Sequence, residues 1–328
     1  MIRTTAYPRA ALIGNPSDGY YGRTIAFVFR DFSAQVELLP SDHLHIVPCG
    51  RERLQFSSIH DLSQEIAANG YYGGVRLVKA AIRVFTHYAA EQGADTSANF
   101  RISYQSDIPG RLGLAGSSAI VTAAMRALMQ FYKVEIPNPI LANLILSAEK
   151  DELKIGAGLQ DRVAQVYGTP VYMDFDKKLM GSRGYGEYVP FDKSLLPPIY
   201  LAYRTNLSEG SEMTHNDLAR RYAAGDRAVL DAMEQWKALT SEFWRRVSAG
   251  DKNVADLINA NYDLRAGLIP VSSGNKLLVE TARSAGASAK FTGSGGAIIG
   301  TYTDDNMLTA LREAMHGIGA EVLIPDIA

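Results

Sequence analysis

The sequence predicts an α+β protein built from two domains that share a cleft. The chain has 328 residues, which exceeds the usual length of a single domain. Short β-type runs separated by Gly, Pro, Asp and Ser fill residues 10–47, before the apolar period changes to that of helices. Long helical stretches and a few short strands occupy the last third of the chain, so we place the domains at 1–195 and 196–328.

The first half begins as a run of strands and continues as mixed strands and helices. Apolar residues at three-and-four spacing, such as Val75, Val78 and Ile82, predict an amphipathic helix. The expected strands lie at 10–13, 24–29, 33–39, 43–47, 100–106 and 171–175. The expected helices lie at 74–91, from 118 to about 132, at 140–151 and directly after Gly158, with a loop at 181–186.

The second half is expected to be mainly helical, with strands near its start and end. The expected helices lie at 217–224, 227–248, 254–266, 276–284 and 306–316. The expected strands lie at 199–203, 289–291, 297–301 and 321–324. This half is therefore predicted to be α+β, and no internal repeat at solenoid or propeller periods is found.

The charge balance and the lone cysteine limit the class of partner. Thirty-three Lys and Arg face thirty-five Asp and Glu, so no sequence-wide charge favours nucleic acid or an anionic membrane. We therefore expect a small polar ligand, and neither a nucleic acid nor a membrane as partner. No apolar run reaches the roughly 18 residues of a membrane span. Cys49 is the only cysteine, which excludes an internal disulfide, and a reducing cytoplasm is the expected location.

A glycine-rich segment between a predicted strand and a predicted helix is suited to binding phosphate. It reads Ile108-Pro-Gly-Arg-Leu-Gly-Leu-Ala-Gly-Ser-Ser-Ala119. Small residues let backbone N–H groups approach an anion, and the start of a helix supplies unpaired N–H donors. Ser117 or Ser118 could also offer a hydroxyl to Mg²⁺. The alternative is an ordinary turn with a serine N-cap, and the segment lacks the Gly-Lys-Ser/Thr of a Walker A loop.

Two acids in the following helices form a second candidate group. Glu149 lies near the end of the predicted helix 140–151, and Asp161 lies in the first turn after Gly158. Phosphoryl transfer needs Mg²⁺ on the phosphates and a carboxylate near the attacking hydroxyl, and this pair could divide those tasks. The alternative is that both acids are helix caps or solvated charges.

Two further segments carry polar or backbone groups that could meet a ligand. The predicted strand 10–13 leads into a turn with Asn15, Ser17, Asp18 and Tyr21, whose side chains suit sugar hydroxyls. Asn-Pro-Ser-Asp-Gly is equally an ordinary turn sequence. The second segment is Lys290-Phe-Thr-Gly-Ser-Gly-Gly-Ala297, in which glycines permit close approach of a ligand or form a simple β-turn or bulge.

These segments, in this order and spacing, resemble the superfamily of galactokinase, homoserine kinase, mevalonate kinase and phosphomevalonate kinase, the GHMP kinases. The resemblance covers nearly the whole chain, and within the superfamily it is strongest to the glucuronokinases. The motifs that carry it are Leu12-Ile-Gly-Asn-Pro-Ser-Asp18, Gly113-Leu-Ala-Gly-Ser-Ser-Ala119, Leu146-Ser-Ala-Glu-Lys150, Gly158-Leu-Gln-Asp-Arg-Val-Ala-Gln-Val-Tyr-Gly168, Met173-Asp-Phe175, Asp263-Leu-Arg265 and Lys290-Phe-Thr-Gly-Ser-Gly-Gly-Ala297.

The resemblance implies a fold and a set of site residues. The fold has an amino-terminal domain with a left-handed βαβ crossover, a ferredoxin-like carboxy-terminal domain, and an active site in the cleft between them. The resemblance implies ATP over Gly113, Leu114, Ala115, Gly116, Ser117 and Ser118, Mg²⁺ at Ser118 and Glu149, and Asp161 and Arg9 as catalytic residues. The substrate-binding residues that we expect are Asn15, Asp18, Tyr21, Gly293, Ser294, Gly295 and Arg265. The usual Gly-Leu-Gly-Ser-Ser is one residue longer here, Gly-Leu-Ala-Gly-Ser-Ser, which leaves open which serine meets the metal.

The reaction that the resemblance implies is transfer of the terminal phosphoryl group of ATP to the anomeric hydroxyl of D-glucuronate. A uronic acid needs a cationic partner for its carboxylate, and arginine is the best suited side chain. The candidates are Arg23, Arg111, Arg183 and Arg265, of which the last is ranked first through the Asp-Leu-Arg resemblance. The alternatives are a kinase for galacturonate, fucose or a heptose phosphate, a non-catalytic sensor of sugar and ATP, and a structural nucleotide-binding module.

Overall fold

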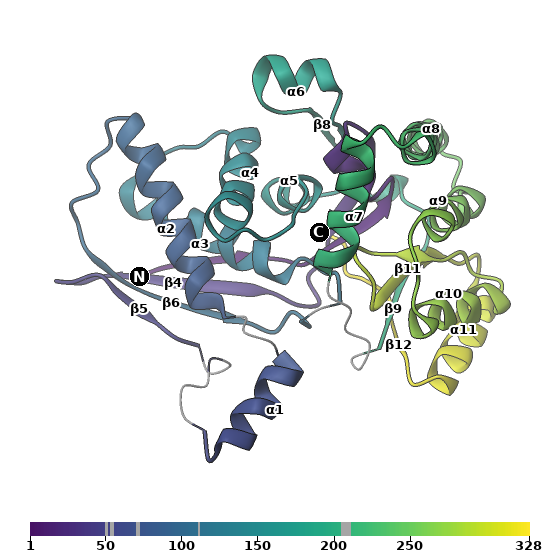
Figure 1. The fold of residues 1–328 in the computed structure, drawn as a ribbon, viewed down its shortest axis with the longest axis horizontal. Helices are drawn as coiled ribbons and strands as arrows, with labels where there is room; N and C mark the ends of the chain where they lie inside the picture. The colour runs from purple at the N-terminus through teal and green to yellow at the C-terminus, as the bar shows by residue number, and fades with distance from the viewer. Residues whose placement is uncertain (50–51, 53–55, 70–72, 111, 205–210) are drawn as a thin grey trace.

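Three four-stranded sheets with helices packed against them make up the described part of the chain (Figure 1). The structure is a computed structural model, and it describes residues 1–49, 52, 56–69, 73–110, 112–204 and 211–328. Among the helices of these residues, none combines the length and the apolar composition that a membrane crossing requires.

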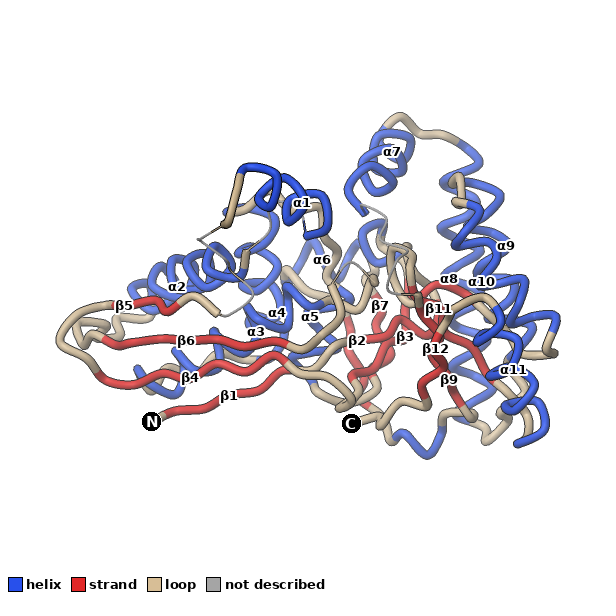
Figure 2. The backbone as a smooth tube through the Cα atoms, turned by 90° about the horizontal axis from the view of Figure 1, so that it is seen from below, coloured by secondary structure: helices blue, strands red, loops and turns tan. Residues whose placement is uncertain are grey.

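The first sheet has one face covered by helices. Its strands, in the order β1-β4-β6-β5, are β1 (Ile2–Ala6), β4 (Ala34–Pro40), β6 (Phe100–Ser106) and β5 (His45–Val47). Val36 and Leu38 are fully buried, whereas the intervening Glu37 is partly exposed, which is the alternation of a half-covered sheet. The covering helices are α2 (Gly74–Glu91) and α3 (Gly116–Tyr132), which lie on one side of the strands (Figure 2).

A crossover connection joins two parallel strands of this sheet. β5 pairs in parallel with β6, and the chain between them passes through α1 (Ile59–Asn69) and α2. Parallel neighbours cannot be joined by a tight turn, so a helical crossover is required here. The strand β6 then leads directly into the glycine-rich segment before α3, which places that segment at the end of the sheet.

The second sheet lies at the centre of the molecule. Its order is β2 (Arg9–Ile13), β3 (Arg23–Val28), β7 (Val171–Asp174) and β8 (Glu187–Pro190), with every pair antiparallel. The strand β2 is buried along its whole length, because both α5 (Gln160–Tyr167) and α8 (Arg227–Ser248) pack on β2 and β3. A 3₁₀ turn at Ser17–Tyr20 joins β2 to β3.

The third sheet has the ferredoxin-like order. Its antiparallel strands are β10 (Lys290–Phe291), β11 (Ala297–Thr301), β9 (Ile199–Tyr203) and β12 (Glu321–Leu323), in that order. In chain order the second strand thus pairs with the third, and the third and fourth flank the first, as in a split β-α-β-β-α-β motif. The helices of this half are α7 (Ser211–Ala223), α8, α9 (Ala255–Leu268), α10 (Ser273–Ser284) and α11 (Asp305–Gly317).

The two faces of the third sheet belong to different cores. Leu201 and Ile299 join the large core of the amino-terminal half, whereas Tyr200 and Ile298 pack in a second core with residues of α10 and α11. Because strand residues alternate between faces, the sheet lies between the two cores and is buried on both sides. The amino-terminal half and the third sheet are therefore in direct contact, and the loops at this contact form the candidate site.

Most expected elements are present, and the differences have local causes. The strands β1 and β8 and the helices α1 and α6 (Lys177–Arg183) were not expected. The helix α6 begins at a cap in which Asp176 accepts hydrogen bonds from the N–H groups of Lys178 and Leu179, a signal too short to predict from periodicity. The expected helix 140–151 ends early: α4 (Asn138–Ser147) gives way to a π turn over Ala148–Glu152.

Candidate active site

The strand β2 connects two glycine-rich loops that are far apart in the sequence. The N–H group of Arg9 donates to the carbonyl of Leu114, 3.1 Å away, in the loop before α3. Two residues later, the N–H group of Ala11 donates to the carbonyl of Thr292, 3.0 Å away, in the turn between β10 and β11. The loop 112–116 and the turn 292–296 are thus held by the first three residues of one buried strand.

The side chain of Arg9 makes the same connection and adds a carboxylate. Its Nη1 donates to the carbonyls of Gly113 and Thr292, at 2.6 and 2.9 Å, and its Nε donates to Oδ1 of Asp161 at 2.5 Å. Only 7% of the side chain is exposed, so this ion pair is shielded from water. The two residues expected to be catalytic are therefore in direct contact.

The helix α5 presents two residues to this region from one face. Asp161 and Gln165 are four residues apart and lie one above the other on the helix. Gln165 Nε2 donates to the carbonyls of Ala115 and Tyr7, at 2.9 and 3.0 Å. Asp161 thus reaches the loop through Arg9, and Gln165 reaches it directly.

A second buried arginine joins Asp161 to the other acid of the site. Arg162 donates through Nε to Oε2 of Glu149 at 2.9 Å, and its Nη2 contacts the same oxygen. Its Nη1 donates to the carbonyl of Gly158 at 2.8 Å and lies 3.3 Å from Oδ2 of Asp161. The four side chains therefore form a continuous buried row of alternating charge, in the order Glu149, Arg162, Asp161, Arg9. We call this row the charge chain.

The charge chain keeps Asp161 ionised. Burial by itself would raise the pKa of Asp161, but the neighbouring charges of Arg9 and Arg162 outweigh it and hold the pKa below its usual value. The pKa of Arg162 is raised above its usual value, because Glu149 and Asp161 outweigh the effect of burial. Asp161 is thus a permanent anion at neutral pH, with each oxygen facing a guanidinium.

The carboxylate of Asp18 lies beside the start of α5 in a different environment. Its Oδ2 accepts a hydrogen bond from the N–H group of Gln160 at 3.2 Å. Gly158 permits this approach, since a Cβ there would lie 2.0 Å from Oδ2. Burial, together with the negative charge of Asp161, raises the pKa of Asp18 to about 6. Two carboxylates with pKa values moved in opposite directions therefore share one region.

Asn15 lies close to the same turn and is fixed through its backbone. Asn261 of α9 accepts from the N–H group of Gly14 at 2.7 Å and donates to the carbonyl of Asn15 at 3.2 Å. The side-chain oxygen Oδ1 of Asn15 is buried and has no hydrogen-bond partner among the described residues. A buried acceptor without a partner is costly, which favours a ligand hydroxyl or water at this position.

The turn 292–296 is held from behind by Arg265 of α9. Nη2 of Arg265 donates to the carbonyl of Ser294 at 3.0 Å, and Nη1 lies 3.4 Å from the carbonyl of Gly293. The guanidinium also lies 5.1 Å from the ring centre of Phe291. Arg265 is 7% exposed, so this support of the turn is shielded from water.

Lys290 and Asn275 complete the support of this turn. The ammonium of Lys290 donates to the carbonyls of Ala11 and Phe291, at 2.7 and 2.8 Å, and the residue is 1% exposed. Burial, and then the nearby Arg265 and Arg9, lower the pKa of Lys290 well below its usual value. Oδ1 of Asn275 accepts from the N–H group of Gly296 at 2.8 Å.

The loop before α3 contains two residues in the left-handed conformation, one of them a glycine. Gly113 has a φ of 65° and Ala115 has a φ of 60°, both in the left-handed region, so the chain reverses sharply into the helix. A Cβ on Gly113 would lie 2.9 Å from the nitrogen of Ser294, which shows how closely the loop and the turn approach. The helix begins at Gly116, so both serines lie in its first turn.

The two serines differ in access. Ser118 is fully buried, and its hydroxyl donates to the carbonyl of Ala115 at 3.1 Å. Ser117 is half-buried. Oε1 of Glu149 is buried and has no hydrogen-bond partner among the described residues, so it is the oxygen of that carboxylate that could still accept a ligand. In the described part of the chain no three His, Cys, Asp or Glu side chains gather as a metal site, so phosphate oxygens would have to complete one.

Several expected residues lie outside this contact network. Tyr21 is 39% exposed and has the ammonium of Lys177 5.6 Å from its ring centre. Arg23 donates to Asp174 and Ser241, and Arg183 donates to Gly186, Tyr185 and Glu187, so neither guanidinium points to the charge chain. Arg111 lies outside the described residues.

Three side chains of the site had no role in the sequence-based expectations. Arg162 and Lys290 stand inside quoted motifs without a function, and Gln165 was not singled out. The sequence carries two signals for them: Arg162 directly follows Asp161, and Gln165 is four residues after Asp161, which places both on one face of α5. Their partners, Glu149 and the carbonyls of Ala115 and Ala11, are visible only in the fold.

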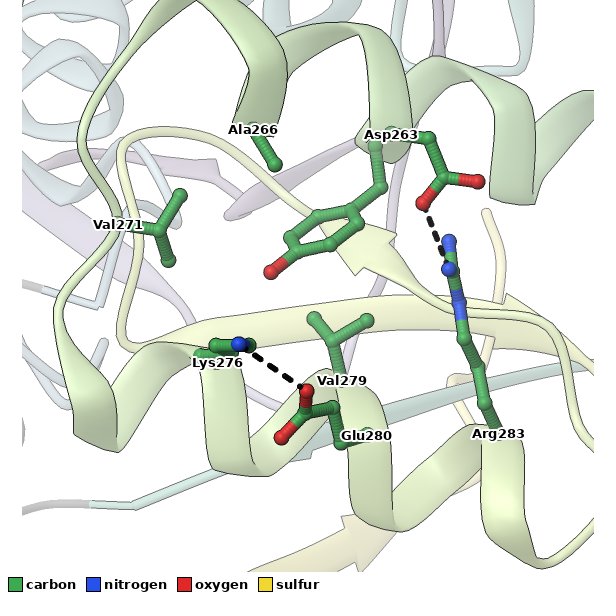
Figure 3. A pocket seen from close by; sticks show the side chains of 8 residues that line it. Asp263, Ala266, Val271, Lys276, Val279, Glu280 and Arg283 are labelled. Carbon is green, nitrogen blue, oxygen red and sulfur yellow. Dashed lines mark hydrogen bonds and ion pairs between the residues drawn. The ribbon is translucent and has the colours of Figure 1, made fainter.

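A cavity of about 370 Å³ opens elsewhere, between α9 and α10 (Figure 3). Its acidic and basic side chains are already paired: Asp263 with Arg283 at 2.7 Å, and Lys276 with Glu280 at 3.5 Å. It contains no member of the charge chain and offers no unpaired cation to a triphosphate. The phosphate-binding candidate is therefore the loop 112–116, not this cavity.

Comparison with known proteins identifies the family of the chain. The family description "GHMP kinases N terminal domain" matches residues 76–169. Glucuronokinase 1 of Arabidopsis thaliana is 42% identical over 306 residues, which cover 91% of this chain and 84% of that protein. Probable glucuronokinase 2 of the same plant is 44% identical over 303 residues, covering 90% and 82%.

A solved structure shows the same fold at low sequence identity. Streptococcus pneumoniae phosphomevalonate kinase, in complex with phosphomevalonate and AMPPNP, superposes with a TM-score of 0.78 at 14% identity, over the full length of both chains. This likeness concerns the fold. The identity to the two Arabidopsis proteins over most of their length is decisive, and the chain belongs to the GHMP kinases, in the family of the glucuronokinases.

Proposed function

We propose that the chain transfers the terminal phosphoryl group of ATP to the anomeric hydroxyl of D-glucuronate, giving ADP and glucuronate 1-phosphate. The observation that carries the proposal is the buried charge chain of Glu149, Arg162, Asp161 and Arg9, which ends on the loop 112–116. Phosphoryl transfer depends mainly on positioning and on charge stabilisation, and this arrangement supplies both.

In the proposed complex the phosphates of ATP lie over the loop 112–116. The left-handed turns at Gly113 and Ala115, together with the first turn of α3, offer N–H donors and the positive end of a helix. A cavity of about 400 Å³ lies between the end of β5 and the strand β6, lined in part by Tyr104. Because β6 runs directly into the phosphate loop, we assign this cavity to the nucleoside end of ATP.

Mg²⁺ is the proposed metal, and Glu149 with a serine of α3 would hold it. The unpartnered Oε1 of Glu149 is a hard oxygen of the kind that Mg²⁺ prefers, and one carboxylate plus phosphate oxygens is its usual environment. Ser118 is the first candidate for the serine, and Ser117 is the alternative because it is more accessible. When bound, the ion would neutralise charge on the phosphates.

Asp161 is proposed to orient the attacking hydroxyl. Its carboxylate is held ionised by two guanidiniums, so it accepts the hydroxyl hydrogen bond in a fixed direction. The sugar oxygen forms the new bond to the γ-phosphorus as the bond to the β-phosphate oxygen breaks, and the hydroxyl proton leaves toward Asp161 or water. Arg9 is placed to stabilise charge on the phosphoryl group in transfer.

The turn 292–296 is proposed to bind the sugar together with Asn15, Asp18 and Tyr21. Arg9 donates to the carbonyl of Thr292, and Arg265 donates to the carbonyls of Gly293 and Ser294. In a planar trans peptide the N–H group of the next residue points in the direction opposite to the carbonyl. The N–H groups of 293–295 donate no hydrogen bond within the described structure, and they suit an oxyanion. We propose that Arg265 acts on the uronate carboxylate through this turn.

The domain assignment and the location are part of the proposal. Residues 1–195 carry the phosphate loop and the charge chain, and residues 196–328 carry the turn that closes the site. A reducing cytoplasm, where ATP is available, suits a chain with a single cysteine.

The decisive test is the product formed from glucuronate. Purified protein with ATP and Mg²⁺ is expected to release ADP only when glucuronate is present, and phosphorus NMR is expected to show an anomeric phosphate. Galacturonate, fucose, a heptose phosphate and glucose serve as a comparison panel. Faster turnover of another panel member would reassign the substrate, and no sugar-dependent ADP with any of them would favour a sensor.

A further inference from the structure

Arg162 contacts both carboxylates that the proposed reaction uses. It reaches Oε2 of Glu149 with two nitrogens and lies 3.3 Å from Oδ2 of Asp161, while a bond to the carbonyl of Gly158 fixes its position. Its side chain is 4% exposed. A guanidinium suits such a bridge because its five N–H groups lie in one rigid plane.

The charges of the chain balance only when Arg162 is included. Glu149 and Asp161 supply two negative charges, and Arg9 and Arg162 supply two positive charges. Because the group is shielded from water, removal of one cation leaves a buried net negative charge, which attracts any other cation more strongly than an exposed carboxylate would.

Arg162 also limits how Glu149 can meet a cation. Both of its contacts fall on Oε2, whereas Oε1 is buried and has no hydrogen-bond partner among the described residues. One oxygen of the carboxylate is therefore taken and the other is free, and the guanidinium charge opposes a second cation nearby.

We propose that Arg162 is a positioning residue for phosphoryl transfer, which orients Asp161 and restrains Glu149 so that a divalent cation is held through Oε1 alone and less tightly than the carboxylate would otherwise allow. This inference rests on the proposed function. Loss of the Arg162 charge is therefore expected to change two quantities in opposite directions. The affinity for the metal rises, and the rate of phosphoryl transfer falls.

The test compares Arg162→Gln and Arg162→Lys with the unaltered protein. Mn²⁺ binding is measured by calorimetry or electron paramagnetic resonance in the presence of a non-hydrolysable ATP analogue and without sugar. Arg162→Gln is expected to bind Mn²⁺ about tenfold or more tightly, because a net negative charge is uncovered. Its kcat is expected to fall by about 10²-fold or more, because Asp161 loses one of its two positioning contacts.

Arg162→Lys separates charge from geometry. Lysine keeps the positive charge but has no planar fork to bridge two carboxylates, so Mn²⁺ affinity is expected to stay near that of the unaltered protein while kcat falls. This variant also serves if Arg162→Gln fails to fold. A Lys variant that binds Mn²⁺ as tightly as expected for Gln would show that charge is not the cause.

A partly buried arginine outside the charge chain provides the control. Arg126 donates to the backbone carbonyls of Thr5, Gln165 and Val166, so Arg126→Gln is expected to lower the melting temperature and leave Mn²⁺ affinity unchanged. Unchanged or weaker Mn²⁺ binding in Arg162→Gln would overturn the inference. The binding assay contains no sugar, so it tests the role of Arg162 independently of the substrate. The identity of the substrate is tested by the ADP-release assay.

Discussion

Two aspartates of the same region have opposite electrostatic environments. Asp161 faces two guanidiniums, whereas Asp18 accepts one backbone N–H group and lies near the negative charge of Asp161. The pKa of Asp161 is therefore lowered and that of Asp18 is raised to about 6. Such a divergence between neighbouring carboxyl groups is typical of sites in which they have different tasks.

We predict that Asp161→Asn lowers kcat by about 10²- to 10⁴-fold. Asparagine keeps the shape but cannot hold the negative charge that orients the hydroxyl and pairs with Arg9 and Arg162. Steady-state ADP release with glucuronate measures the effect. Turnover within a few-fold of the unaltered protein would remove Asp161 from the mechanism.

We predict that Asp18→Asn stabilises the fold at neutral pH while reducing sugar binding. The folded-state pKa of about 6 exceeds the ordinary 3.8, so the folded chain holds this proton more tightly, and stability falls as pH rises from about 4 to about 6. Asparagine avoids that loss and still accepts from the N–H group of Gln160. The gain in unfolding free energy is expected to reach up to about 3 kcal/mol near pH 7.5, since one pKa unit corresponds to about 1.4 kcal/mol.

Chemical denaturation at a series of pH values checks this prediction. The difference between Asp18→Asn and the unaltered protein is expected to vanish near pH 4 and to be constant above about pH 7. Asp231→Asn is a control, because that side chain is 61% exposed and its pair with Arg227 is a surface one. A pH-independent difference for Asp18→Asn would contradict the assigned environment.

For the choice of arginine, residue chemistry alone was insufficient. Four arginines were candidates for the carboxylate, but Arg23 and Arg183 are engaged elsewhere and Arg265 supports the turn 292–296. Arg162, which no sequence pattern assigned, joins the two acids of the candidate site, and its partner Glu149 lies in the π turn after α4. All arginines look alike in a sequence, and only their partners distinguish them.

Among the elements, the turn 292–296 and the loop 112–116 act as a matched pair. A Cβ on Gly293 would lie 2.5 Å from the carbonyl of Gly113 and 3.1 Å from Nη1 of Arg9. Glycine is therefore required for close approach of the two backbones. The two loops come from different halves of the chain, so their contact closes the site.

We predict that Gly293→Ala separates the loops and impairs the site. The methyl group would displace the carbonyl of Gly113 or the guanidinium of Arg9, so kcat/KM is expected to fall by about 10-fold or more, as small displacements of a site do. Melting temperature and kcat/KM are the measurements.

Gly267→Ala is the matched control, since no atom lies within 4 Å of a Cβ at that helical position. The unfolding free energy of this variant is expected to rise by about 0.5–1 kcal/mol, because alanine has a higher helix propensity than glycine. If the two alanine variants had the same melting temperature and kcat/KM, the loops would have space for a methyl group at Gly293.

At the scale of elements, prediction succeeded where periodicity was long and failed where the signal was local. The pattern of α2 and α3 extends over many residues, and both helices were expected. The short elements β1, α6 and β8 were missed, because a few residues with one cap or one alternating pair do not rise above chance. The helix α1, with 11 residues, was also missed. The π turn holding Glu149 has no periodic signature either.

In the molecule as a whole, Arg9 is the junction of three separate segments. It binds the loop before α3, the turn after β10 and the helix α5 through contacts 104, 283 and 152 residues apart in the chain. The strand β2 that carries it is buried between the halves. The assembly of the site and the stability of the fold therefore depend on the same side chain.

We predict that Arg9→Lys lowers the stability of the fold and weakens binding at the site. Lysine lacks the fork that reaches three acceptors, so at least one charged hydrogen bond is lost, which costs about 2 kcal/mol of unfolding free energy. The KM values for ATP and sugar are expected to rise together, because both loops lose their common support. Denaturant unfolding and steady-state kinetics measure these effects.

Arg30→Lys is the control, since that side chain is 46% exposed and lies 3.6 Å from Asp326. A surface pair of this kind contributes at most about 1 kcal/mol. If Arg9→Lys proved as mild as this control, Arg9 would not be the junction described here.

The amino-acid order alone was enough for the α+β class and the GHMP kinase family, and it singled out the loop 112–116, Asp161 and Glu149 as candidates, because motifs and periodicity are local properties. The charge chain, the backing of the turn by Arg265 and Lys290, and the contrast between Asp161 and Asp18 required the folded chain. Burial and pairing depend on which distant segments meet, and the free energy of a charge is set by its neighbours in space rather than in sequence.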